Sequence, residues 1–120
     1  MADFANSSIQ RVVHIRELKW SHAEKVFARQ AFDLALCNEL QATIQEAKEC
    51  AAKIQGPSEL WELESWLTEC RQDIDRRYDY RYSVLPIVFA HLLRDGYLRE
   101  DDLKGLRPEK LELIYRGATF

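Results

Sequence analysis

Glycine and proline are scarce in this sequence, with four glycines and three prolines among 120 residues. Both residue types interrupt helices, and the first of either kind is Gly56, followed directly by Pro57. Good helix formers, namely Ala, Leu, Gln, Glu and Lys, fill the preceding stretch from residue 21 onward. No stretch of the chain predicts a sheet of any size. We therefore expect an all-α fold.

Cysteine is also rare, and the chain lacks the long apolar runs of membrane-spanning proteins. Cys37, Cys50 and Cys70 form no C-x-x-C pair, so we interpret them as small core residues in a reducing compartment. The longest uncharged run, residues 82–93, is too short to span a bilayer. The first ten residues lack the features of a secretory signal. The expected location is the cytoplasm, without membrane insertion.

Motifs that carry chemistry are absent as well. His14, His22 and His91 have no partner at metal-ligand spacing. The glycines form no phosphate-binding loop, and no serine or cysteine stands in a nucleophile motif. With 20 acidic and 17 basic residues, the net charge of −3 does not suit a nucleic-acid binder, which must neutralise phosphates. We expect no enzyme activity, no metal, no cofactor and no nucleic-acid partner.

One long helix is the first element that the sequence predicts. Ser21 is a good N-cap and Glu24 completes a capping box, so the helix is expected over residues 21–54. Such a helix is roughly 50 Å long, whereas a compact protein of this size has a radius of gyration of about 14 Å. Its apolar stripe consists of Phe32, Leu36, Leu40, Ile44, Ala47, Ala51 and Ile54. Because the stripe continues to the overhanging end, something must cover it there.

A second helix is expected to double back on the first as a hairpin. Pro57 ends the first helix and Ser58 caps the second. The second helix carries an apolar seam with nearly heptad spacing, made of Leu60, Leu63, Leu67, Cys70, Ile74 and Tyr78. A two-helix hairpin is too thin to bury its own seams. We therefore expect an elongated homodimer with Ile44 and Leu60 in its apolar interface.

The remaining residues are interpreted as a small helical head. A third helix is expected to start near Ser83, with Pro86 tolerated in its first turn and Gly96 as its C-terminal stop. Two shorter helical pieces follow, in the segments REDDLKGL and RPEKLELIYRG. In the second piece, Pro108 lies near the first position and Gly117 comes after the end.

The domain organisation follows from these elements. Residues 20–120 are expected to form a single domain, in which residues 20–82 are the hairpin and dimerisation stalk and residues 83–117 the head. Residues 1–19 are an N-terminal arm without a strong pattern. For this arm, a short strand and a disordered segment both stay open.

Two surface clusters suggest binding. The run RRYDYRY, residues 76–82, mixes arginine and tyrosine as some RNA-binding surfaces do. We favour a structural joint between hairpin and head, because cations suit a helix C-terminus and Asp79 neutralises the run locally.

The second cluster surrounds Trp61, which lies off the leucine seam and on the same flank of the helix as Arg71. Arg71 can form an ion pair with Asp75, four residues further along. Trp with Arg is typical of a binding hot spot, but packing against the hairpin turn or a second subunit explains Trp61 equally well.

Four segments carry a resemblance to a known family: WSHAE, ELWELESWLTECR, DIDRRYDYRYSVLPIVFAHLLRDGYL and DLKGL. In their order and spacing the chain resembles the fluorescence recovery protein family, over about residues 20–115. The resemblance implies an all-α homodimer with Ile44 and Leu60 at interface positions. It also implies binding to photoactivated orange carotenoid protein, mainly through that protein's C-terminal domain. Such binding speeds the return from red to orange and the release from phycobilisomes, which restores fluorescence without any bond chemistry.

The resemblance further implies a partner-binding patch, which reads Trp-x-x-His-Asp followed six residues later by Arg. Trp61 and Arg71 match this pattern. Glu64 stands in place of the histidine and Ser65 in place of the aspartate. In the head, Ile87 stands where some relatives have an aromatic residue. The scaffold is thus retained, whereas the partner surface is only half retained.

Two other functions stay open on the sequence. A divergent member with this half-retained patch would bind a different protein, in an organism without orange carotenoid protein. A dimeric helix-turn-helix regulator is the second alternative, in which the segment LLRDGYLREDDLKGLRPEKLELIYR supplies short DNA-contacting helices. The weak basic charge of that segment counts against DNA binding.

Overall fold

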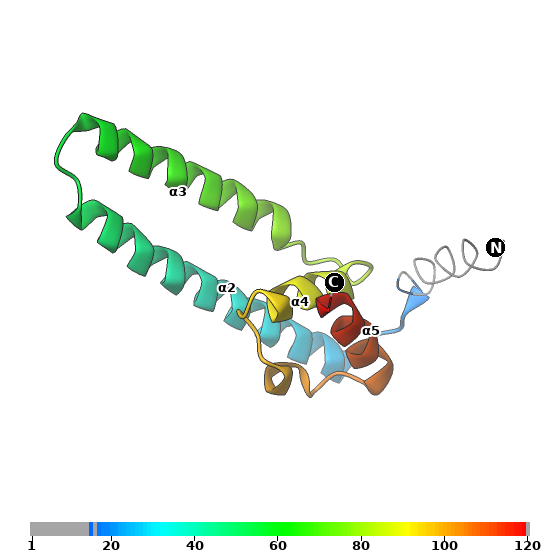
Figure 1. Cartoon of the computed structure of the whole chain (residues 1–120). Helices are drawn as coiled ribbons and strands as arrows, with labels where there is room; N and C mark the ends of the chain where they lie inside the picture. Colours follow the sequence, from blue (N-terminus) through cyan, green and yellow to red (C-terminus); the bar gives the residue numbers. More distant parts are fainter. Residues whose placement is uncertain (1–14, 16, 120) are drawn as a thin grey trace.

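The computed structural model describes residues 15 and 17–119 of the chain. Those residues contain four α-helices, one short 3₁₀ helix and no strand (Figure 1). The elements are α2 (His22–Ala52), α3 (Pro57–Arg77), α4 (Leu85–Arg94), η1 (Glu100–Leu103) and α5 (Pro108–Ala118). The predicted all-α class is confirmed, with a long α2–α3 hairpin and a small head made of α4, η1 and α5.

The predicted start of the first helix is confirmed by its cap. The Ser21 hydroxyl accepts a hydrogen bond from the Glu24 backbone N–H at 3.1 Å, and the Ser21 N–H donates to the Glu24 carboxylate at 3.2 Å. Both donors belong to the helix end, where no intrahelical partner exists. The helix ends at Ala52, two residues before the predicted end, and Lys53 is its C-cap.

Three further helix boundaries differ from the predicted ones. Helix α3 is capped by Gly56 and not by Ser58, because Pro57 itself occupies the first turn, where its missing N–H does no harm. Helix α4 begins at Leu85, two residues after the predicted start. Gly117 lies inside α5 and not beyond it, since a Cβ there would lie 2.8 Å from the Cβ of Ala90 on α4.

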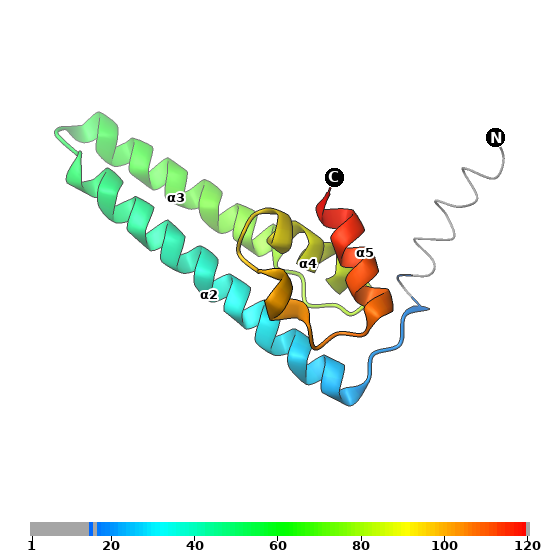
Figure 2. The ribbon, with the colours of Figure 1, turned by 60° about the horizontal axis from the view of Figure 1, so that its bottom comes forward.

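The hydrophobic core lies in the head and under the N-terminal half of α2. Its buried members are Ala28, Ala31, Phe32, Ala35, Leu85, Val88, Phe89, Ala90, Leu92, Leu98, Leu103, Leu106 and Ile114. Gly96 has a φ of 84°, which suits glycine and turns the chain after α4 as predicted. The core is therefore a helix-on-helix packing between α2 and the head (Figure 2).

The outer stalk, residues 40–76, extends away from this core and contains no buried side chain. The described chain measures 57 × 37 × 21 Å and has a radius of gyration of 17.9 Å, against about 14 Å for a compact protein of this length.

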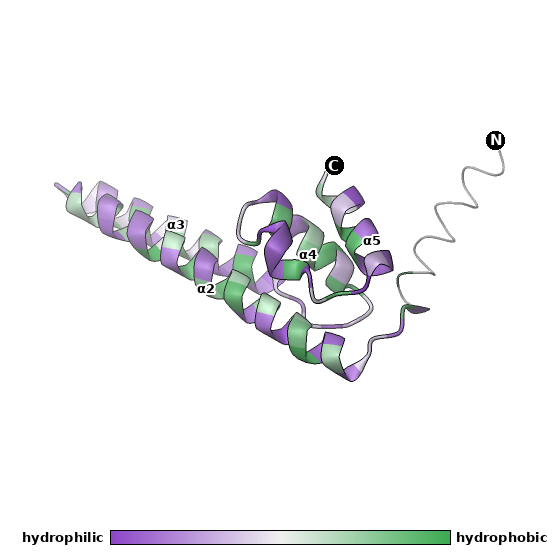
Figure 3. Cartoon of the chain, turned by 90° about the horizontal axis from the view of Figure 1, so that it is seen from below, coloured by the Kyte–Doolittle hydropathy of each residue, from purple (hydrophilic) through white to green (hydrophobic). Residues whose placement is uncertain are grey.

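The cysteines do not lie in the core of the single chain. Cys37 and Cys50 are exposed and Cys70 is half-buried, so their prediction as core residues is wrong for the single chain. Hydrophobic residues alternate with hydrophilic ones along both stalk helices (Figure 3).

Tyrosines form the joint between hairpin and head, as predicted for the run RRYDYRY. The rings of Tyr78 and Tyr80 meet the ring of Phe32 edge-on, with centroids 5.4 and 4.9 Å apart. The ring of Tyr82 packs between Tyr80 and Trp20, at 5.6 and 5.4 Å. Such pairs favour tilted geometry and add to the free energy of burial. These tyrosines therefore contribute to the structure of the joint.

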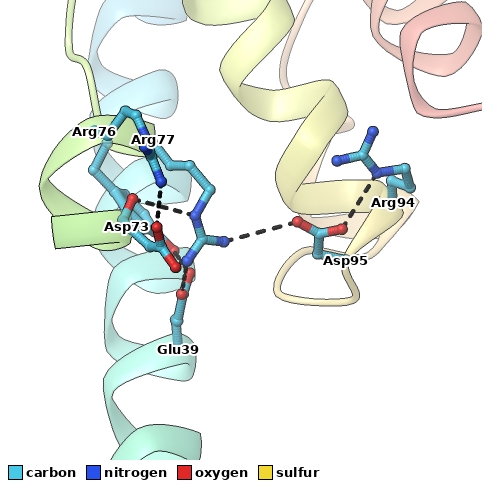
Figure 4. Close-up of polar contacts among 7 residues, drawn as sticks. Glu39, Asp73, Arg76, Arg77, Arg94 and Asp95 are labelled. Atoms are coloured by element: carbon cyan, nitrogen blue, oxygen red, sulfur yellow. Dashed lines mark hydrogen bonds and ion pairs between the residues drawn. The ribbon is translucent and has the colours of Figure 1, made fainter. Parts of the chain in front are cut away.

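An ion-pair cluster fastens the base of the stalk to the head (Figure 4). Arg77 at the end of α3 pairs with the buried Glu39 of α2 and lies 3.7 Å from a carboxylate oxygen of Asp95, which follows α4. The Tyr78 hydroxyl donates to Glu39 at 3.0 Å. Burial, together with this hydrogen bond, raises the pKa of Tyr78, so its hydroxyl stays protonated. The cluster joins α2, α3 and α4 at one point.

Candidate protein-binding surface

Trp61 is the most exposed large hydrophobic residue among the described residues, with 60% of its surface accessible. It lies on α3 in the outer stalk, away from the core. Packing of Trp61 against the hairpin turn is therefore excluded within a single chain, which leaves a second subunit and another binding partner as explanations. An indole left this exposed has an apolar surface available to another protein molecule.

The neighbours of Trp61 on α3 divide into two sides. Glu64 and Ser65 are both exposed, one turn further along. Ser65 lines a shallow depression with Trp61, whereas Glu64 and Arg71 do not. At 100° per residue, Glu64 and Arg71 lie on the side of Trp61 that faces the leucine seam, and Ser65 lies on the other side. The four residues thus follow a strip about 15 Å long.

Besides Ser58, which was predicted only as a helix cap, three residues of the depression were missed by the sequence analysis. Its lining consists of Ser58, Trp61, Glu62, Ser65, Trp66 and Glu69. The i,i+4 series from Ser58 and from Trp61 would have found Glu62, Trp66 and Glu69, because such residues share a helix face. Two of these three residues are acidic, so the depression has a negative rim.

Arg71 is exposed at the far end of the strip. Its expected pairing with Asp75 is not found, and among the described residues Arg71 forms no ion pair. No carboxylate in the described part of the chain therefore competes for this guanidinium. An unpaired arginine beside an exposed tryptophan retains its full capacity for hydrogen bonds to a partner.

The two predicted interface residues lie on different helices and are equally exposed. Ile44 on α2 and Leu60 on α3 are each 46% accessible, and Leu40 and Leu67 are 42% and 40% accessible. Leu40 and Ile44 line a shallow groove along α2. In the head, Ile87 is also 46% accessible. Part of each predicted seam is thus exposed in the single chain, at Leu40 and Ile44 on α2 and at Leu60 and Leu67 on α3.

The described residues offer little for other kinds of site. They contain no group of three or more His, Cys, Asp or Glu side chains that could hold a metal ion. No helix in the same part of the chain is long and apolar enough to cross a membrane.

Comparisons with known proteins agree on one family. The family described as photoprotection regulator fluorescence recovery protein matches residues 20–116. The fluorescence recovery protein of Synechocystis is 35% identical over 98 residues, which is 82% of this chain and 90% of the relative.

Solved structures of the same family have the same fold. The fluorescence recovery protein of Fremyella diplosiphon superposes with a TM-score of 0.81 at 39% identity, and that of Synechocystis with a TM-score of 0.81 at 33% identity. Each comparison covers 85% of this chain and 100% of the solved chain. The chain therefore belongs to the fluorescence recovery protein family of photoprotection regulators.

Proposed function

We propose that this chain is a homodimer in solution and that the outer stalk forms the interface. The support is the row of exposed aliphatic side chains on both helices, with Ile44 and Leu60 each 46% accessible. A monomer rarely leaves such a contiguous apolar seam in water. A second copy, related by a two-fold axis, would cover the same seam on both protomers at once.

We further propose that the dimer binds photoactivated orange carotenoid protein through its C-terminal domain. Membership of the family supports this partner, and the 60% accessibility of Trp61 is the observation that carries the surface assignment. Trp61 serves as the apolar anchor and Arg71 as the cation of the surface. Glu64 lies between them on the side toward the dimer seam.

The mechanism consistent with this surface is conformer-selective binding. A protein that binds one conformer preferentially shifts the populations, and it lowers the barrier when its affinity for the transition state is higher still. Accelerated return of the carotenoid protein from red to orange then requires no bond chemistry, no cofactor and no metal. We propose on this basis that the protein is not an enzyme.

Glu64 and Ser65 are expected to weaken the contact. If each replaced residue costs about 1 kcal/mol at the interface, the two together raise Kd about 30-fold. Glu64→His combined with Ser65→Asp should therefore lower the Kd for an isolated C-terminal domain of orange carotenoid protein by a comparable factor. Isothermal titration calorimetry measures the effect.

Loss variants test the same surface in the opposite direction. Trp61→Ala and Arg71→Leu should each weaken binding at least about tenfold, since hot-spot truncations cost more than 1 kcal/mol. Arg76→Leu is the matched control, because Arg76 is an exposed arginine of the same helix that lies off the strip. If the wild type binds tightly and neither Trp61→Ala nor Arg71→Leu changes the Kd, the partner binds elsewhere.

A different protein partner is the second candidate, and the Glu64 and Ser65 replacements favour it. In that case the wild type does not bind the carotenoid-protein domain, while the Glu64→His, Ser65→Asp variant does. The helix-turn-helix alternative receives less support, because η1 spans only four residues, three of them acidic. Such a short acidic turn is poorly suited to the major groove.

A further inference from the structure

The depression beside Trp61 lies on the face of α3 that points away from the leucine seam. At about 100° per residue, its lining residues fall within an arc of about 140° that is centred roughly opposite Leu60, Leu63 and Leu67. Figure 1 shows α3 along one edge of the molecule, with α2 on its other side. A homodimer that forms through the seam therefore leaves the depression open.

Two indoles flank the depression. Trp61 and Trp66 are five residues apart, so their side chains leave α3 in directions about 140° apart. Ser58 and Ser65 lie between these directions, and their short side chains leave the helix surface hollow there. Trp61 is 60% accessible and Trp66 is half-buried. The sides of the depression thus offer aromatic surface, which attracts cations.

Two carboxylates lie between the indoles. Glu62 and Glu69 both line the depression, and both are exposed. They are seven residues, or two helical turns, apart, which is about 10 Å along the helix axis. Among the residues that the structure describes, neither glutamate forms an ion pair.

This part of α3 also contains no cation of its own. Residues 57–70 include four glutamates and no lysine, arginine or histidine, and Arg71 is the first cation of the helix. Lys53, the C-cap of α2, shares a neighbouring pocket with Glu62 and Trp66. Within the described part of the chain, however, Lys53 pairs with no carboxylate. The two carboxylates of the depression are therefore available to a cation from another molecule.

We propose that the depression between Trp61 and Trp66 binds an arginine-bearing segment of the partner protein, with guanidinium groups at Glu62 and Glu69. Arginine fits both features, because its planar guanidinium stacks on indole rings and forms paired hydrogen bonds to carboxylates. The inference rests on the proposed function in one respect, namely that the Trp61 surface faces a protein partner. It adds the charge of the segment that the partner presents there.

A peptide titration tests this arginine site without the carotenoid protein. The probe is acetyl-Gly-Arg-Gly-Gly-Arg-Gly-amide, whose two arginines lie about 10 Å apart when the peptide is extended. The matched control peptide has the uncharged citrulline at both positions. The indole N–H signals are followed in ¹H–¹⁵N NMR spectra of the full-length protein.

We expect the arginine peptide, at millimolar concentration, to shift the signals of Trp61 and Trp66. The signal of Trp20, which packs against Tyr82 at the joint, should stay in place. The citrulline peptide should shift none of the three. Equal shifts with both peptides, or no shift of Trp61 and Trp66 with the arginine peptide, overturn the proposal.

Carboxylate variants test which groups bind the peptide. Glu62→Gln combined with Glu69→Gln should weaken peptide binding about fivefold, the size of two exposed ion pairs. Glu100→Gln combined with Glu112→Gln is the matched control, because it removes the same charge from exposed residues of the head. This control should leave peptide binding unchanged. Equal weakening by the two double variants, or no weakening by the first, contradicts the site.

Failure of this inference is distinguishable from failure of the proposed function. A wild type that binds the arginine peptide as described, but not the carotenoid-protein domain, supports the arginine site and excludes that partner. A wild type that binds the domain with a Kd that Glu62→Gln combined with Glu69→Gln does not change supports the proposed function and overturns the arginine site.

Discussion

Leu60→Glu is expected to convert the protein from dimer to monomer. In the proposed dimer the Leu60 side chain is buried by the second copy, so the substitution places a carboxylate in an apolar contact twice per dimer. An unpaired charge in such a place costs several kcal/mol, which raises the dimer Kd at least about 100-fold. Light scattering coupled to size exclusion at micromolar concentration measures the mass.

Ile87→Glu is the control for this substitution. Ile87 and Leu60 have the same accessibility of 46%, but Ile87 lies on α4 in the head and not on the stalk. The Ile87 variant should remain dimeric. A wild-type protein that is already monomeric at micromolar concentration, or an Ile87 variant that dissociates as Leu60→Glu does, contradicts the stalk interface.

Lys110→Met is expected to destabilise the fold by about 3–5 kcal/mol, the usual effect of removing one partner from a buried ion pair. Lys110 is 0% and Glu24 3% accessible, and the ammonium lies 3.0 and 3.1 Å from the two carboxylate oxygens. Without the lysine, the carboxylate keeps the N–H of Arg107 at 3.1 Å and the largely exposed Arg107 side chain, whose Nε lies 3.7 Å away, and it loses its only buried cation. Urea unfolding followed by circular dichroism measures the loss.

Two further variants test whether the buried charge is the cause. Adding Glu24→Gln to Lys110→Met removes the unpaired charge and should recover part of the lost stability. Lys104→Met should change the free energy of unfolding by less than about 0.5 kcal/mol, because the Lys104–Asp101 pair is 73% exposed on both sides. Equal effects of Lys104→Met and Lys110→Met would show that burial of the pair is irrelevant.

The same carboxylate predicts how stability depends on pH. Burial raises the pKa of Glu24, but hydrogen bonds from the Arg107 and Ser21 N–H groups and from Lys110 outweigh it, so the pKa lies below its ordinary value of 4.5. Because the folded pKa is the lower one, the stabilisation is fully present above pH 4.5 and is lost as the pH falls through the folded pKa.

Local signals predicted the helices well because their causes are local. The capping box at Ser21 and the helix stop at Gly96 depend on residues within a few positions, and both were predicted. Gly117 was misplaced because its small size serves contact with Ala90 on another helix. The Glu24–Lys110 pair was not predicted at all, since its members are 86 positions apart.

The exposure of Trp61 was predictable from the sequence, whereas several contacts of the stalk were not. Helical spacing was enough to place Trp61 off the seam, and its exposure agrees with that. The cysteines were assigned to a core that the stalk of a single chain does not have. The expected Arg71–Asp75 pair depended on side-chain rotamers, and i,i+4 spacing alone does not determine them.

Dark recovery kinetics test the central claim most directly. Orange carotenoid protein is converted to its red form by light, and the decay of red absorbance in the dark is followed with and without this protein. Our account predicts that the wild-type protein accelerates the decay, but less than the Synechocystis relative does. The variant with Glu64→His and Ser65→Asp should accelerate the decay more than the wild type. The Trp61→Ala variant should not accelerate it. An unchanged decay rate with the wild type, or full acceleration that survives Trp61→Ala, would contradict it.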